Sequence, residues 1–175
     1  MFREGEYVMY SGEGLCRIEK IGVPDFQSEK KEYYFLRNSE NSSRIYVPTD
    51  TLQPMRRPMT AAEAAQFLEG LDKLSITVPK KGESKRQLQV IRETVRAQTA
   101  EAMAKTIRMI RALHPDGKYP AVEKMILDRT EKSLCEEMAY ALQIPKEEAE
   151  VKVRNAVKTL GIKDNKKGAI SNEEN

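Results

Sequence analysis

Side chains capable of metal or nucleophilic chemistry are sparse in this 175-residue sequence. It contains two cysteines, Cys16 and Cys135, and a single histidine, His114. Two cysteines cannot form a disulfide framework or a zinc site by themselves, although counting leaves a Cys–His pair open. The run from His114 to Gly117 also contains Pro and Asp, which predicts a turn between two helices. We therefore expect no metal site, no cofactor and no catalytic residue.

Phosphate-binding and acid–base motifs are also missing. The sequence has neither a GxxxxGK[ST] loop nor a GxGxxG fingerprint. Residues 10–14 are rich in glycine, but no lysine and no helix follow them, so we predict a tight turn between two strands. Adjacent acidic pairs such as Glu136-Glu137 point in different directions on a helix, which indicates solvated surface. Without a nucleophile and its base, we expect that the protein is not an enzyme.

Positive charge is concentrated in one block of the sequence. The net charge is +3, yet residues 80–118 alone hold ten Lys and Arg against four Asp and Glu, a net of +6. Phosphate contact needs only positioned cations, so the block predicts contact with a nucleic-acid backbone without sequence preference. The alternative is a solvated helix face. The candidate cations are Lys80, Lys81, Lys85, Arg86, Arg92 and Arg96, with further charge expected from Lys105, Arg108 and Arg111.

Residues 1–58 have the alternating pattern of short strands joined by polar turns. We predict strands at residues 6–10, 15–21, 32–37, 44–47 and about 53–57. Five such strands indicate a small curled barrel of the Tudor or SH3 type. The fourth strand consists of Arg44, Ile45, Tyr46 and Val47 and ends at Pro48. It either offers a free edge to another protein or merely fills the barrel with Ile45 and Val47 while Tyr46 faces solvent.

Residues 59–162 have helical periodicity, so the predicted fold is a two-domain α+β chain with a C-terminal bundle of about five helices. We place these helices at about residues 60–71, 84–96, 99–113, 120–142 and 145–160. The second helix should bury Leu88, Ile91 and Val95 and present Lys85, Arg92 and Arg96 on the opposite side. Residues 75–82 are predicted to be a linker and residues 163–175 a flexible polar tail.

No apolar run approaches the ~20 residues of a membrane span, and the first residues include acids and no apolar stretch. We therefore expect a cytoplasmic protein that does not contact membranes. We also expect the free protein to be a monomer.

The sequence resembles the CarD family in several short motifs. These are Phe2-x-x-Gly5-x-Tyr7-Val8-Met9-Tyr10, Gly12-x-Gly14, Ile18-x-x-Ile21, Tyr33-Tyr34-Phe35-Leu36, Ile45-Tyr46-Val47-Pro48 and Met55-Arg56. The resemblance implies an N-terminal barrel that docks on the β subunit of bacterial RNA polymerase. It also implies a helical domain that reaches promoter DNA at the upstream edge of the melted bubble and changes open-complex stability without chemistry. An RNA- or ribosome-binding module is the alternative.

The resemblance further implies that Ser84-Lys85-Arg86, which opens the second helix, lies at the DNA. Better-known family members carry a Trp just before this motif, used as a wedge against the minor groove. Glu83 stands at that position here, and the chain has no Trp. A carboxylate repels phosphates and cannot prop apart base steps, so the sequence predicts DNA proximity without an aromatic wedge.

Overall fold

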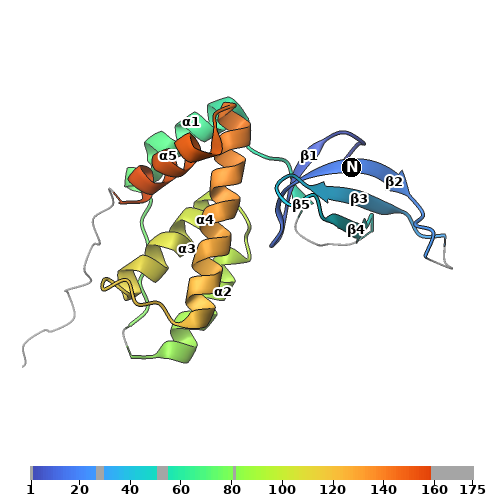
Figure 1. The fold of residues 1–175 in the computed structure, drawn as a ribbon. Coiled ribbons are helices and arrows are strands. Elements are labelled where there is room, and N and C mark those ends of the chain that lie inside the picture. The colour runs from blue at the N-terminus through green and yellow to red at the C-terminus, as the bar shows by residue number, and fades with distance from the viewer. Residues whose placement is uncertain (1, 27–29, 51–54, 81, 159–175) are drawn as a thin grey trace, which may run out of the picture.

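The computed structural model describes residues 2–26, 30–50, 55–80 and 82–158. A curled antiparallel sheet is followed by five helices in the described residues, which confirms the predicted α+β architecture (Figure 1). The sheet has five strands in the order β4-β3-β2-β1-β5. Their bounds are β1 Tyr7–Tyr10, β2 Gly14–Gly22, β3 Tyr33–Asn38, β4 Arg44–Pro48 and β5 Met55–Arg56.

The sheet curls into a half-barrel around a small apolar core. Inward side chains alternate with outward ones along the strands, because successive residues of a strand point to opposite faces. The buried set is Val8, Cys16, Ile18, Tyr34, Leu36 and Val47. The turn between β1 and β2 contains Gly12 and Gly14 at φ +81° and +78°, conformations that L side chains rarely adopt. The glycines at residues 10–14 therefore serve a strand-to-strand turn, as predicted.

The helices lie close to the predicted positions. They are α1 Ala61–Gly70, α2 Ser84–Val95, α3 Ala100–Leu113, α4 Ala121–Leu142 and α5 Lys146–Lys158, with a 3₁₀ turn at Leu71–Lys73 after α1. Thr60 and Glu63 form a capping box at the start of α1, in which the Thr60 amide donates to Glu63 Oε2 at 2.7 Å. The predicted end of the last helix, residues 159–160, and the predicted tail lie outside the described residues.

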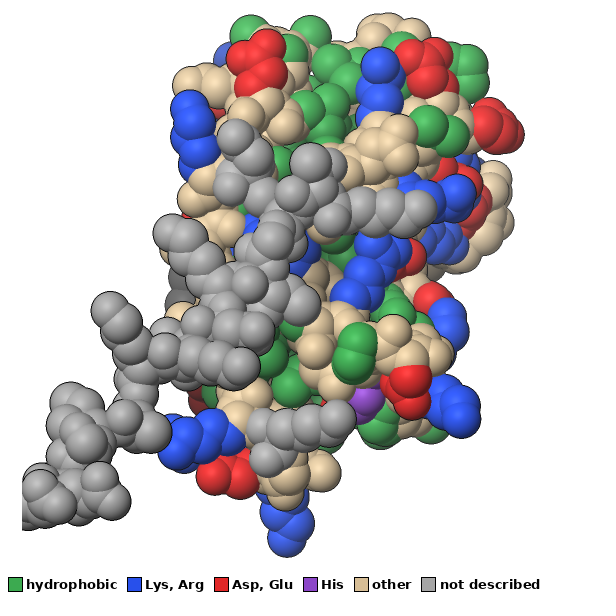
Figure 2. Space-filling model, turned by 90° about the vertical axis from the view of Figure 1, so that its left-hand side faces the viewer, with side chains coloured by type: hydrophobic (Ala, Val, Ile, Leu, Met, Phe, Trp, Pro, Cys, Tyr) green, Lys and Arg blue, Asp and Glu red, His purple; other side chains and the backbone are tan. Residues whose placement is uncertain are grey.

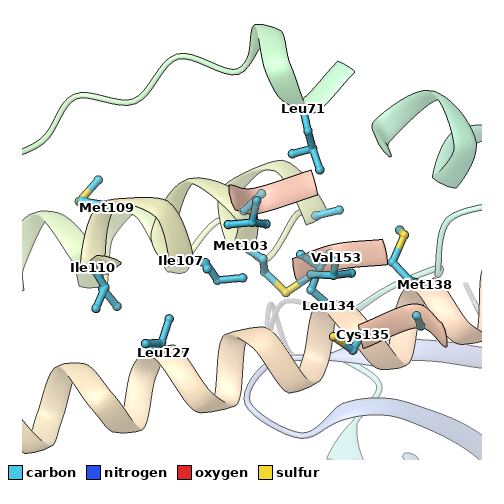
Figure 3. Close-up of a cluster of buried hydrophobic side chains, with 14 of the residues drawn as sticks. Leu71, Met103, Ile107, Met109, Ile110, Leu127, Leu134, Cys135, Met138 and Val153 are labelled. Carbon is cyan, nitrogen blue, oxygen red and sulfur yellow. The ribbon is translucent and has the colours of Figure 1, made fainter. Parts of the chain in front are cut away.

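Helix α3 runs through the centre of the helical domain. Its Met103, Ile107 and Ile110 are buried against Leu127 and Leu134 of α4 and against α5 (Figure 3). Arg108 on the same helix is also buried, and its Nη1 donates to the Leu74 carbonyl. The prediction that Arg108 belongs to a basic surface is therefore wrong, because its guanidinium fastens the segment that follows the 3₁₀ turn.

The two domains meet along α4, the helix that faces the sheet in Figure 1. The ring centroids of Tyr7 and Tyr140 are 4.8 Å apart across this junction, and the Leu15 amide donates to Glu136 Oε2 at 3.1 Å. Glu137 is fully buried. The interpretation of Glu136 and Glu137 as solvated surface is therefore wrong, because the sheet covers the side of α4 that carries them.

None of the helices that the structure describes is long and apolar enough to cross a membrane.

Candidate docking edge and nucleic-acid-contacting helix

Strand β4 lies at one edge of the sheet, and within the described residues it pairs only with β3. Arg44 and Tyr46 point outward and are exposed, whereas Val47 is buried and Ile45 packs against the barrel core. Both sequence interpretations of this strand are thus compatible, because alternate residues fill the barrel while the backbone edge stays available. Of the four predicted docking residues, Arg44 and Tyr46 expose their side chains to solvent.

Three aromatic rings form an exposed cluster beside this edge. Tyr46 lies between Phe26 and Phe35, with ring centroids 5.0 Å from each in edge-to-face geometry. Phe26 is 66% exposed and Tyr46 39%. Exposed, rigid aromatic surface is typical of the energetically important centre of protein interfaces. Sequence analysis missed Phe26, although a Phe in a loop of Pro and Asp, outside any apolar period, is a signal for an exposed aromatic side chain.

A row of arginines crosses the outer face of the same strands. Arg17 of β2 lies opposite Arg37 of β3, which lies opposite Arg44 of β4. Glu19 forms an ion pair with Arg37, and this hydrogen bond, helped by the charges of all three arginines, lowers the pKa of the Glu19 carboxyl. One carboxylate leaves the row with excess positive charge. Like charges directly opposite one another are unfavourable in a sheet, so an acidic partner surface would relieve them.

Helix α2 carries the predicted DNA-contacting cations on its exposed side. Lys85, Arg86, Arg92 and Arg96 are all exposed. Because Lys85, Arg92 and Arg96 are spaced by seven and four residues, they form a stripe along one side of the helix. The stripe spans ~16 Å at the rise of an α-helix. The arrangement can neutralise several phosphates of a nucleic acid backbone.

The remaining predicted DNA residues lie at the entrance to α2. Glu83 precedes the first helical residue, Ser84, and both are exposed. Glu83 Oε2 accepts a hydrogen bond from Arg86 Nη1 at 3.3 Å, so the acid partly neutralises a predicted phosphate ligand. Lys80 is also exposed, and its carbonyl accepts from Gln87 Nε2 at 2.6 Å. Lys81 lies outside the described residues.

The buried side of α2 differs in part from the predicted one. Ile91 is fully buried as expected, but Gln87 is buried too, because its amide fastens the chain before the helix. Leu88 is half-buried and lines a shallow groove together with the Lys85, Arg92 and Arg96 side chains. The predicted placement of Leu88 opposite the cations is therefore wrong, since a position three residues after Lys85 is adjacent to the stripe.

The other cations predicted on α3 are engaged within the protein. Lys105 forms an ion pair with Glu101, and Arg111 with Glu131. On the face turned away from the sheet, acidic and basic side chains of the described residues are interspersed (Figure 2). The basic surface is thus narrower than predicted and centres on α2.

His114 and the cysteines serve the fold. His114 Nε2 lies 2.6 Å from Glu123 Oε2 and joins the end of α3 to the start of α4. Burial raises the pKa of the Cys16 thiol to about 12 and that of Cys135 to about 11, so both stay protonated and unreactive. Among the described residues, no three His, Cys, Asp or Glu side chains are grouped to hold a metal ion.

Comparison with known proteins finds similarities for the N-terminal domain and for most of the chain. Residues 2–59 match the family model described as "CarD-like/TRCF RID domain". The chain is also 24% identical over 145 residues to the "Putative transcription factor YdeB" of Bacillus subtilis (strain 168). That alignment covers 79% of this chain and 90% of the relative, so it extends through the helical domain.

Proposed function

Because residues 2–59 match the family model of the CarD-like/TRCF RID domain, we propose that this protein is a bacterial transcription regulator. In this proposal the sheet docks on the β subunit of RNA polymerase, and helix α2 contacts promoter DNA near the upstream edge of the open bubble. The protein performs no chemistry and changes the stability of the open complex in the cytoplasm. The family match of the N-terminal domain carries the proposal, and the name of the Bacillus relative agrees with it.

The docking surface that we propose combines the β4 edge, the aromatic cluster of Phe26, Phe35 and Tyr46, and the arginine row. The free edge supplies backbone donors and acceptors in strand geometry. The aromatic rings supply apolar area, and the arginines favour an acidic partner and speed its approach. These three features lie on the same three strands and their flanking loop, so one partner surface can contact all of them.

The DNA-contacting surface that we propose is the stripe on α2. Its cations can bind phosphates, whose contacts position a protein without reading sequence. We expect no base-specific contacts from the stripe, because the sequence contains no recognised base-reading motif. The protein therefore depends on polymerase for its place on a promoter.

The experiment that tests this function measures binding of the full chain to purified RNA polymerase core enzyme. Tyr46→Ala is expected to weaken binding by ~2 kcal/mol, about 30-fold, because a central aromatic anchor is lost. Phe26→Ala should act in the same direction. Val151→Ala, which truncates an exposed apolar residue on α5, is the matched control and should leave the affinity unchanged.

A result of equal affinity for native protein and a folded Tyr46→Ala variant would remove β4 from the interface. Co-sedimentation with ribosomes, in place of binding to polymerase, would instead favour the RNA-binding alternative.

A further inference from the structure

A single arginine of the sheet joins three distant segments of the chain. Arg56 of β5 donates Nη1 and Nη2 to Glu137 Oε1 and Oε2 at 2.5 and 2.6 Å. Its Nε donates to the Gln98 carbonyl at 2.6 Å. The planar guanidinium therefore holds α4 with its fork and the α2–α3 connection with its remaining N–H.

The surroundings of Arg56 make this joint stiff. Glu137 is fully buried, and besides Arg56 it accepts the Met59 amide at 3.0 Å, which fastens the chain between β5 and α1 to α4. Gln98 adopts φ +55°, a left-handed conformation that is costly for a residue with a side chain. Such a conformation persists only when its neighbours hold it, and here Gln98 Nε2 donates to the Val95 carbonyl while its own carbonyl accepts Arg56 Nε.

The Gln98 carbonyl lies just beyond the C-terminal end of α2. Helix α2 packs mainly on α3, and the connection at Gln98 is where the sheet reaches the end of α2. The hydrogen bond from Arg56 to Gln98 therefore connects the sheet directly to the end of α2.

We infer that Arg56 is a positioning residue, which fixes the direction of the basic helix α2 relative to the polymerase-docking sheet. The inference deepens the proposed function and rests on it for its biological meaning. When the sheet docks, Arg56 determines where the cations of α2 are presented. The geometry of the joint itself is testable in the free protein.

The most discriminating variant is Arg56→Lys. Lysine keeps the positive charge that the buried Glu137 requires, but a single ammonium lacks the fork and the separate Nε–H that reach Glu137 and Gln98 together. The fold should therefore survive while the orientation loosens. Arg57→Lys is the matched control, because the side chain of the neighbouring Arg57 forms an ion pair with Glu6 and lies over the Phe2 ring, both in the N-terminal domain.

The measurement is the distance distribution between spin labels on the sheet and on α2 in the full chain. Cysteines introduced at the exposed positions Arg3 and Gln89 take the labels, since the buried thiols of Cys16 and Cys135 are unreactive. We expect one narrow peak for the native chain and for Arg57→Lys, and loss of that peak for Arg56→Lys. The Arg56→Gln, Glu137→Gln double variant, which leaves no buried charge unpaired, should also lose it.

An unchanged narrow peak in folded Arg56→Lys, or equal broadening in Arg57→Lys, would overturn the inference. Polymerase binding is measured on the same variants to separate the two proposals. Arg56→Lys should bind polymerase like the native chain, because β4 is the opposite edge of the sheet from β5. If neither the native chain nor any variant binds polymerase, while the distance distributions change as expected, the proposed function is refuted and the positioning role of Arg56 stands.

Discussion

At the level of single residues, Glu136 is the most unusual ionisable group of the domain junction. Burial raises the pKa of its carboxyl, even though the Leu15 amide donates to Oε2 and favours the charged form. Its other oxygen, Oε1, is buried and has no hydrogen-bond partner among the described residues. The junction therefore contains a carboxyl group with one oxygen hydrogen-bonded and one buried oxygen unpaired among the described residues.

A raised carboxyl pKa means that the folded state binds the proton more tightly than the unfolded state. The free energy of unfolding must then fall as pH rises from the ordinary Glu pKa through the raised one. We predict that Glu136→Gln increases this free energy at pH 7 by ~1–2 kcal/mol, the scale of one unsatisfied buried group. Urea unfolding at pH 7 and at about pH 4, below the ordinary Glu pKa, should show the difference disappear in acid.

Glu40 provides the matched control on the same junction. Its hydrogen bonds from Lys132 and Lys146 lower its carboxyl pKa, so its stabilising effect is present at neutral pH and lost as pH falls. Glu40→Gln should therefore lower the free energy of unfolding at pH 7 and have the same free energy of unfolding as the native chain in acid. A Glu136→Gln variant that is less stable than the native chain at pH 7 would contradict the prediction.

Glu83 is the residue on which the proposed DNA contact depends most directly. It is exposed at the entrance to α2 and partly neutralises Arg86. We predict that Glu83→Trp lengthens the lifetime of the open complex, because it frees Arg86 for phosphate, removes a repulsive carboxylate and adds apolar surface at the minor groove. The measurement is open-complex dissociation at one salt concentration.

Glu83→Gln is the control that removes the charge without adding a ring. A lifetime between those of native protein and Glu83→Trp would separate the electrostatic contribution from the wedge. An unchanged or shortened lifetime with Glu83→Trp, at unaltered polymerase affinity, would mean that this residue does not lie at the edge of the bubble.

At the level of elements, the proposed DNA contact of α2 predicts how DNA binding responds to salt. If about five cations of the stripe and its entrance neutralise phosphates, log K against log salt should have a slope of roughly −4 to −5 for duplex DNA. Each lost contact should reduce the magnitude of the slope by about 0.9. We predict such a reduction for Lys85→Gln, equally on unrelated sequences, in fluorescence anisotropy titrations with the full chain.

Lys152→Gln is suited as the comparison, since Lys152 is an exposed lysine of α5 that pairs with Glu148. It should leave the slope unchanged. An affinity that is flat between low and moderate salt would refute phosphate contact by α2.

The positions of these elements follow largely from local sequence signals. Alternation of apolar and polar residues predicts β4. The capping box predicts the start of α1, and the spacing of apolar residues predicts both α1 and α2. These signals act between near neighbours in the chain. Contacts between distant segments were not predictable in this way. The sequence suggested that Glu137 is solvated, but the sheet covers it and Arg56 binds it. The sequence also suggested that Arg108 belongs to a cationic surface, but its guanidinium donates to the Leu74 carbonyl.

The candidate sites show the same division. The exposure of the α2 cations follows from their helical spacing, and the outward position of Tyr46 follows from the alternation of side chains along a strand. The partners of Tyr46 do not, because Phe26 comes from a loop whose path no periodicity fixes. The arginine row depends on strand register, which places Arg17, Arg37 and Arg44 opposite one another across three strands.

At the level of the whole molecule, the junction joins the two proposed binding surfaces. Edge β4 lies on one side of the sheet, whereas α2 belongs to the helical domain on the other side of the junction (Figure 1). Ion pairs from Glu40 to Lys132 and Lys146 and the Arg56–Glu137 pair cross this junction. Docking by one surface therefore orients the other.

The turn glycine at residue 14 restricts which N-terminal domains can replace this one on the same helices. A Cβ built on Gly14 would lie 2.2 Å from Glu136 Oε2, so any side chain there would displace the carboxylate from the Leu15 amide. A barrel taken from another protein can fold perfectly well and still fail to seat on α4 if it has a larger residue at this point. A different N-terminal domain joined to these helices therefore needs a glycine at the position of Gly14, or a shorter side chain in place of Glu136 on α4.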